Sequence, residues 1–143
     1  MVLAALIGLI TGACREPVGT IIQPTDLYGT WEGETIGGGA YLIFRADVAI
    51  NRFEFRAMPG EFGNVLDPGD SLLAMGYFGL SGTIINLVDE EVAVYACPGT
   101  ITDRYDVILN QAGSVMRLDH VGEACPVRAQ LLSGATWIRQ SEE

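Results

Sequence analysis

The sequence predicts an all-β protein, an antiparallel up-and-down β-barrel of about eight strands with one short helical turn near the C-terminus. Turn-forming residues recur about every ten positions from Asp26 onward, a spacing typical of antiparallel sandwiches and barrels. Short segments rich in β-branched and aromatic residues lie between these turns. The 18 glycines and the scarcity of long runs of helix formers argue against a helical bundle.

Alternation of apolar and polar residues marks the strands most clearly. In residues 51–57, Phe53 and Phe55 are predicted to point to one face of the sheet, and the charged residues between them point to water. Residues 103–109 and 115–120 repeat this pattern. One apolar face on each strand indicates a sheet that surrounds an interior, and closure of that sheet removes its exposed edges.

Each predicted element lies between two turn signals. One helical turn is predicted within 126–132, because Pro126 suits the first position of a helix. The longest connection, 62–71, is expected to form a mobile loop at the rim of the barrel. The predicted strands span, in order, residues 27–36, 40–46, 50–57, 72–79, 83–88, 91–96, 102–109, 114–120 and 135–140.

The first 14 residues have the features of an export signal. An apolar run over residues 1–10 is too short to span a bilayer, and the small residues 11–13 precede Cys14. This arrangement resembles the bacterial lipobox, in which the cysteine is lipidated and becomes the mature N-terminus. We therefore expect export to the cell envelope, with a lipid anchor at Cys14. The alternatives are a secretory signal cleaved nearby, with release of the protein, or a buried N-terminal strand.

The remaining chain is expected to form one domain. Its 49% apolar content is sufficient for a single core, and its composition stays even to the C-terminus. The predicted division is a signal segment at 1–14, a short tether at 15–25 and the barrel at 26–143.

Three cysteines divide into one single residue and one pair. If Cys14 carries lipid, Cys97 and Cys125 remain as an even pair, which an oxidising compartment favours. A disulfide between them is expected to stabilise the fold by about 3–4 kcal/mol. The alternative is two buried thiols. A zinc site is not expected, because the cysteines are far apart in the sequence and His120 is the single histidine.

The charged residues exclude several functions. The net charge is −10 and all eight basic residues are arginines, so no nucleic-acid partner is expected. The absence of lysine excludes Schiff-base chemistry. The acidic clusters are expected to be solvated turns, since none offers the several oxygen ligands that calcium prefers. Neither a metal nor a cofactor is expected.

No catalytic residues are expected. The segment 79–82 resembles the start of a nucleophile elbow, but Thr83 occupies the position that requires glycine. His120 is the one side chain suited to act as a base near neutral pH, and we expect it to be solvated at a strand end. An enzymatic function would require His120 to lie beside a buried carboxylate inside the barrel.

Two motifs resemble those of a known family. Residues 26–31 place a Gly-x-Trp at the start of the first strand, and residues 125–139 combine Cys-x-x-Arg with Gly-x-x-Trp-x-Arg. Together they resemble the lipocalin (calycin) superfamily of ligand-binding β-barrels, and bacterial lipocalin-like domain proteins in particular, many of which are exported. The resemblance covers roughly residues 26–140.

This resemblance implies structural roles for the motif residues. Gly29 allows a sharp bend of the chain, and Trp31 closes one end of the barrel. Either Arg139 or Arg128 is expected to lie across the Trp31 ring in a cation–π contact. The structural signature therefore comprises Gly29, Trp31, Arg128, Trp137 and Arg139.

The inward faces of the strands provide the functional hypothesis. A mainly apolar cavity with a few phenolic hydroxyls matches the requirements of a small-molecule site. We expect a monomer that binds a small hydrophobic or amphipathic ligand without transforming it. The alternative is a structural or interaction module of the cell envelope with a packed interior, because an eight-stranded barrel just holds its own side chains. The predicted ligand-binding residues are Tyr41, Phe53, Phe55, Tyr77, Tyr95, Tyr105 and Met116.

Overall fold

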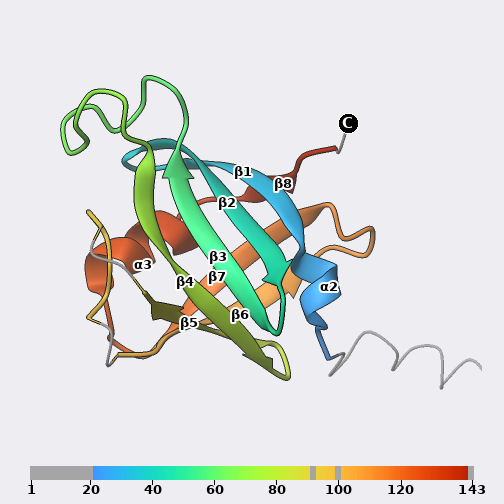
Figure 1. The fold of residues 1–143 in the computed structure, drawn as a ribbon. Coiled ribbons are helices and arrows are strands. Elements are labelled where there is room, and N and C mark those ends of the chain that lie inside the picture. The colour runs from blue at the N-terminus through green and yellow to red at the C-terminus, as the bar shows by residue number, and fades with distance from the viewer. Residues whose placement is uncertain (1–20, 91–92, 99–100, 142–143) are drawn as a thin grey trace, which may run out of the picture.

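In the computed structural model the chain forms a closed barrel of eight antiparallel strands, which confirms the predicted fold class (Figure 1). The structure describes residues 21–90, 93–98 and 101–141. The signal segment 1–14, with Cys14, and the first part of the predicted tether lie outside the described residues. No helix among the described residues is long and apolar enough to cross a membrane.

Each strand pairs with the next one along the chain, and β8 pairs with β1 to close the barrel. Two short helices, α2 and α3, lie at opposite ends of it (Figure 1). In order, the elements are α2 (Pro24–Leu27), β1 (Gly29–Thr35), β2 (Gly38–Asp47), β3 (Ile50–Ala57), β4 (Leu72–Ser81), β5 (Ile84–Asp89), β6 (Asp103–Leu109), β7 (Val115–Val121), α3 (Pro126–Ser133) and β8 (Trp137–Arg139).

The predicted strand at 91–96 is wrong. Residues 93–96 lie in the connection between β5 and β6, which pair directly with each other. That direct pairing leaves no place for a further strand, and the connection crosses the α3 end of the barrel instead. There the backbone N–H of Tyr95 donates to the carbonyl of Leu73 at 2.8 Å.

A short helix begins at the end of the predicted tether and continues into the segment predicted as barrel. Pro24 stands in the first turn of α2, and Gln23 and Asp26 form a capping box, with the Gln23 backbone N–H donating to the Asp26 carboxylate at 2.8 Å. Leu27, the last residue of α2, is fully buried. Among the described residues, the chain therefore packs on the barrel already before β1.

Two glycines shape the wall around the tryptophans. Gly29 has a φ of 126°, a conformation that glycine adopts without the steric cost of a side chain, where the chain turns from α2 into β1. Gly33 faces the Trp137 ring, and a Cβ at this position would lie 2.7 Å from it. The absence of a side chain at Gly33 thus makes room for the larger tryptophan.

The interior of the barrel is filled by side chains. Phe44 and Phe78 meet edge to face with centroids 5.0 Å apart, and Phe55 meets Trp137 in the same way at 6.3 Å. Such aromatic contacts add to the apolar area that each ring removes from water. The largest fully buried side chains include Trp31, Trp137, Arg128, Tyr105, Phe44, Phe53, Phe55, Leu42 and Leu73.

Candidate functional site

Four of the seven predicted ligand-binding residues lie inside the barrel. Phe53, Phe55, Tyr105 and Met116 are at most 1% exposed. A side chain that borders a cavity wide enough for a ligand keeps part of its surface uncovered, whereas a close-packed interior covers it. These four side chains are covered by their neighbours, and the interior has the packing of a core.

Tyr41 and Tyr77 lie on the outer face, which corrects their predicted inward placement. Tyr77 precedes the buried Phe78 on β4, is 37% exposed and packs under the Arg52 guanidinium, 5.5 Å from its ring centroid. Tyr41 likewise precedes the buried Leu42 on β2. Because neighbouring strand residues face opposite sides, both tyrosines point outward. Tyrosine suits an outer face as well as a core, since its ring is apolar and its hydroxyl polar.

Tyr95 lies at the rim rather than on an interior strand face. It belongs to the connection between β5 and β6, and its partly buried ring meets Phe62 edge to face at 6.3 Å. Phe62 belongs to the loop between β3 and β4. The two rings therefore join two loops at the α3 end of the barrel.

The α2 end carries the signature that the resemblance implies. The Arg139 guanidinium lies 4.2 Å from the centroid of the Trp31 ring. Trp31 Nε1 donates to the carbonyl of Leu27 at 2.9 Å, and Arg139 Nε donates to the carbonyl of Gly113 at 2.9 Å. Of the two arginines expected over Trp31, Arg139 fills the place and Arg128 lies at the other end of the barrel.

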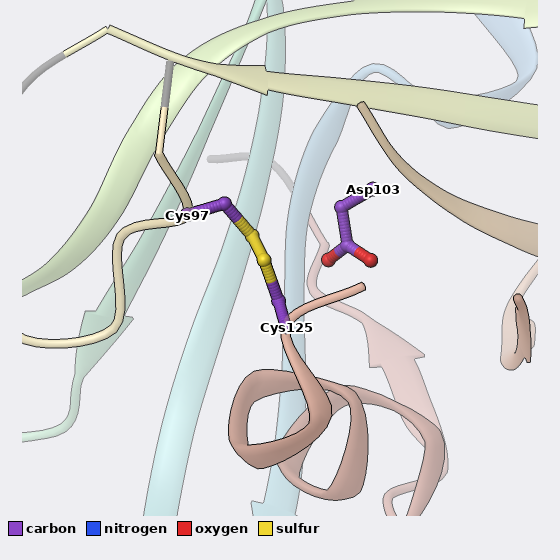
Figure 2. A group of neighbouring side chains, drawn as sticks. All are labelled: Cys97, Asp103 and Cys125. Carbon is purple, nitrogen blue, oxygen red and sulfur yellow. A yellow bond between two sulfur atoms is a disulfide. The ribbon is translucent and has the colours of Figure 1, made fainter. Parts of the chain in front are cut away.

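The two cysteines within the described residues form the expected disulfide. Cys97 and Cys125 are 28 residues apart and their Cα atoms are 5.9 Å apart (Figure 2). The bond joins the connection after β5 to the residue that precedes α3. The buried Asp103 carboxylate lies beside it, and one atom from each of the three residues falls within 4.8 Å of the others. Cys97, Asp103 and Cys125 therefore lie close together in the fold, although Cys125 is well separated from the other two in the sequence.

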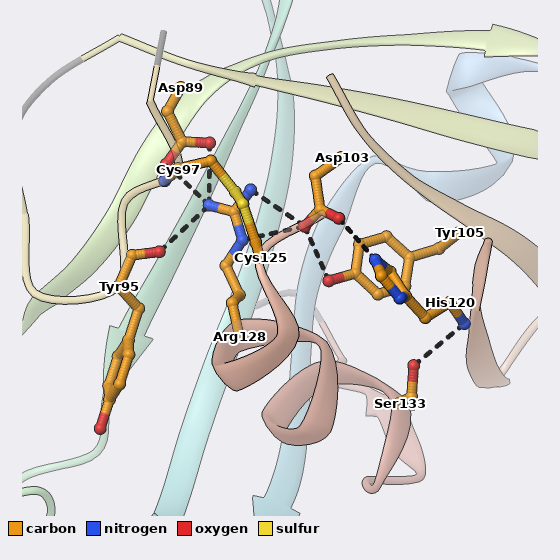
Figure 3. Close-up of polar contacts among 9 residues, drawn as sticks. All are labelled: Asp89, Tyr95, Cys97, Asp103, Tyr105, His120, Cys125, Arg128 and Ser133. Atoms are coloured by element: carbon orange, nitrogen blue, oxygen red, sulfur yellow. Dashed lines mark hydrogen bonds and ion pairs between the residues drawn. A yellow bond between two sulfur atoms is a disulfide. The ribbon is translucent and has the colours of Figure 1, made fainter. Parts of the chain in front are cut away.

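A buried ion-pair network lies next to the disulfide (Figure 3). Arg128, in the first turn of α3, has a side chain that is 1% exposed. Its Nη1 donates to both carboxylate oxygens of Asp89, at 2.8 and 2.7 Å, and its Nε donates to Asp103 Oδ2 at 3.1 Å. Its guanidinium carbon also lies 5.8 Å from the centroid of the Phe53 ring. The network thus closes the α3 end of the barrel and contacts its aromatic interior at Phe53.

His120 belongs to this network, which corrects the expectation that it is solvated. Its Nε2 lies 2.9 Å from Asp103 Oδ1, and its side chain is 15% exposed. The Tyr105 hydroxyl donates to the other carboxylate oxygen at 2.8 Å. The alternation already contained this information, since His120 has the parity of the buried Met116 and Leu118 on β7.

The network raises the pKa of two of its members, Arg128 and Tyr105. Burial alone would lower the pKa of Arg128, but its contacts with Asp89 and Asp103 outweigh burial and raise the pKa above its ordinary value. Burial and the negative charge of Asp103 raise the pKa of Tyr105 well above its ordinary value of 10.0. Arg128 therefore remains a cation and Tyr105 remains a hydrogen-bond donor.

The contact between His120 and Asp103 is the one that an enzymatic function would require. Asp103 is shared, however, with the Arg128 and Tyr105 donors, and the Ser133 hydroxyl accepts the backbone N–H of His120 at 3.1 Å. Two surface concavities lie elsewhere, one of about 1040 Å³ at the α2 end and one of about 620 Å³ on β4–β6. No residue of the network lines either of them.

Comparison with known proteins adds no relative. No family model matches the chain, no curated protein matches it, and no solved structure matches it. The fold and the site therefore define the class of this protein. It is a closed eight-stranded antiparallel β-barrel, compatible with a lipocalin-like fold, whose α3 end is sealed by a disulfide and a buried ion-pair network.

Proposed function

We propose that this protein is a non-enzymatic structural or interaction module of the cell envelope, which acts through the outer surface of a packed lipocalin-like barrel. One observation carries the proposal. The interior side chains expected to surround a ligand are at most 1% exposed, as in a close-packed core. This favours the packed alternative over ligand binding within the barrel.

An apolar strip on the outer surface supports an interaction role. Ile108 on β6 and Ile138 on β8 are each 44% exposed. Val115 on β7 pairs with Ile138, and the next outward residue of β7, Arg117, pairs with Ile108. Val115 and Ile138 therefore lie opposite each other, and Ile108 lies diagonal to Val115 and beside Arg117. This small apolar cluster with a charged neighbour suits a protein partner.

A lipid anchor at Cys14 would orient the barrel relative to the membrane. The backbone N–H of Ile22 donates to the carbonyl of Gly82 at 3.2 Å, so the described chain starts at the α2 end. The segment from Cys14 to Ile21 spans at most about 25 Å when fully extended. A lipid on Cys14 therefore directs the α2 end toward the membrane. The disulfide suits the oxidising compartment that this location implies.

Mass spectrometry tests the anchor. The membrane-associated protein is expected to carry a diacylglyceryl group on Cys14, and Cys14→Ser is expected to release the protein from the membrane fraction. The Cys97→Ser/Cys125→Ser variant serves as the control, because it removes the other two cysteines, which form the disulfide, but keeps the lipid site. An unmodified N-terminus in cytosolic protein would contradict export.

Native mass spectrometry tests whether the barrel binds a ligand. After incubation with an envelope lipid extract, the oxidised protein is expected to keep the mass of the free chain. A fatty-acid-binding protein treated in parallel shows that bound lipid survives the measurement. A retained ligand at one per chain would overturn the packed-module proposal.

Binding of an amphipathic ligand at the α2 end is the second candidate. The concavity of about 1040 Å³ there is lined by apolar residues such as Ile21, Val107 and Leu109, and also by Arg139 and the acidic Asp26 and Asp106. Apolar walls beside charged groups of both signs suit an amphipathic molecule with a polar head. A retained adduct that disappears in Ile21→Glu, and persists in the outward-facing Ile138→Glu, would support this candidate.

A further inference from the structure

We propose that the α3 end of the barrel becomes a binding site for a thiophilic divalent cation, such as Zn²⁺, when the Cys97–Cys125 disulfide is reduced. The ligands are the sulfurs of Cys97 and Cys125 and a carboxylate oxygen of Asp103 (Figure 2). This combination of thiolates and a carboxylate is one that zinc accepts. The site goes beyond the proposed function, since it does not depend on a partner or an anchor.

The three groups already converge. Their ligand atoms lie within 4.8 Å of one another, although they come from the connection after β5, from β6 and from the residue before α3. Ligand distances of about 2.0–2.3 Å around a tetrahedral zinc ion place neighbouring ligands roughly 3.5 Å apart. The observed spacing therefore requires small adjustments once the sulfurs are free to separate.

Asp103 has an oxygen available for an ion. Oδ2 accepts from Arg128 and from the Tyr105 hydroxyl, whereas Oδ1, among the described residues, interacts with His120 alone. A carboxylate oxygen with one such contact retains a second lone pair. The surrounding donors hold the carboxylate in position, as outer partners do for metal-binding carboxylates.

The chemistry also conserves the buried charge. The formal charges of Asp89, Asp103 and Arg128 sum to one net negative charge. A dithiol donor supplies two electrons and two protons, which convert the disulfide into two thiols and the donor into its own disulfide. A divalent cation then displaces both thiol protons, and its two positive charges offset the two thiolates. The buried region thus keeps its net charge of minus one in every state.

Metal titration of the full chain tests the proposal. A Cys14→Ser background leaves Cys97 and Cys125 as the only thiols. The reduced protein is expected to bind one Co²⁺ with thiolate-to-cobalt absorption, and one Zn²⁺ by competition with a chromogenic chelator. The oxidised protein is expected to bind neither. Circular dichroism of the reduced protein, recorded in the same titration, reports whether the barrel stays folded.

Single substitutions identify the ligands. Asp103→Asn removes a proposed ligand and is expected to weaken Zn²⁺ binding by at least about 10–100-fold, the range found when a metal site loses an outer-shell partner. Asp119→Asn is the matched control, because Asp119 lies on β7 with its side chain 53% exposed and near Arg117. Cys125→Ser is expected to abolish the cobalt–thiolate absorption of a one-to-one complex. This variant keeps the buried Asp103 carboxylate, so it tests the site even if Asp103→Asn does not fold.

Three results would overturn the proposal. The first is the absence of one-to-one binding by the folded, reduced protein. The second is binding that Asp103→Asn and Asp119→Asn weaken equally. The third is binding that accompanies loss of the β-sheet signal, because unfolded thiols then hold the ion. None of these results bears on the packed interior or on the anchor, so the proposed function is tested separately.

Discussion

Arg128 is the residue on which the closure of the α3 end depends most. It is the partner of two buried carboxylates, and removal of one member of a buried ion pair leaves an uncompensated charge. We expect Arg128→Met to lower the free energy of unfolding by about 3–5 kcal/mol, measured by urea denaturation. Arg117→Met, at an exposed ion pair with Asp119, is expected to cost about 0–1 kcal/mol. Similar losses in both variants would contradict the role of the network.

Tyr105 makes the stability of the folded protein fall as the pH rises in the alkaline range. Its pKa is raised in the folded protein, whereas the unfolded chain has an ordinary tyrosine pKa of about 10. The unfolded state therefore releases this proton first, and the stabilising contribution is complete below about pH 10 and is lost as the pH rises toward the raised folded pKa. Thermal unfolding as a function of pH should show a shallower alkaline decline in Tyr105→Phe than in the wild type. The outward-facing Tyr77→Phe serves as the control, and equal declines in Tyr105→Phe and the wild type would exclude this role.

Part of the network could be predicted at the level of single residues. Asp103 and His120 have the same strand parity as Tyr105 and Met116, so a period of two places all four on inward faces. The general expectation that charged residues are solvated outweighed that pattern. The partner that makes their burial possible, Arg128, lies on a helix, and its approach depends on the packing of α3 rather than on a local pattern.

At the scale of elements, the disulfide holds α3 and the connection between β5 and β6 together. Chain entropy predicts that its removal lowers the free energy of unfolding by about 3–4 kcal/mol. In Cys97→Ser/Cys125→Ser, hydrogen exchange is expected to accelerate in α3 and in residues 93–98, while β1–β3 remain protected. Cys14→Ser should leave the exchange pattern unchanged. Uniform acceleration over all strands would show that this end does not open as a unit.

Most strands could be predicted because alternation and turn residues act locally. The error at 91–96 has a physical cause, since an apolar, β-branched segment also serves a connection that crosses the end of a barrel. There Tyr95 bonds to Leu73 and Cys97 donates its backbone N–H to Asp89 at 2.9 Å, so the backbone is satisfied without a strand. These partners are distant in sequence, and the pattern of one segment does not reveal them.

At the scale of the whole molecule, the turn spacing predicted a closed barrel but left open whether it is hollow. That property depends on the summed volume of side chains that meet from all the strands. Trp31, Trp137 and the buried Arg128 converge from β1, β8 and α3, and together with the phenylalanines they fill the interior. Alternation identifies inward positions, but it does not measure the space between them.

The packed interior is tested most directly by the free energy of unfolding of Ala40→Leu. Ala40 lies on β2, fully buried beside the inward-facing Leu42, whereas Ala46 on the same strand is exposed. A filled barrel has no room for the larger side chain, so Ala40→Leu is expected to lower the free energy of unfolding by about 1–3 kcal/mol. The same change at Ala46 is expected to shift it by less than about 0.5 kcal/mol. An Ala40→Leu variant as stable as the wild type, or more stable, would show a hollow barrel and contradict the account.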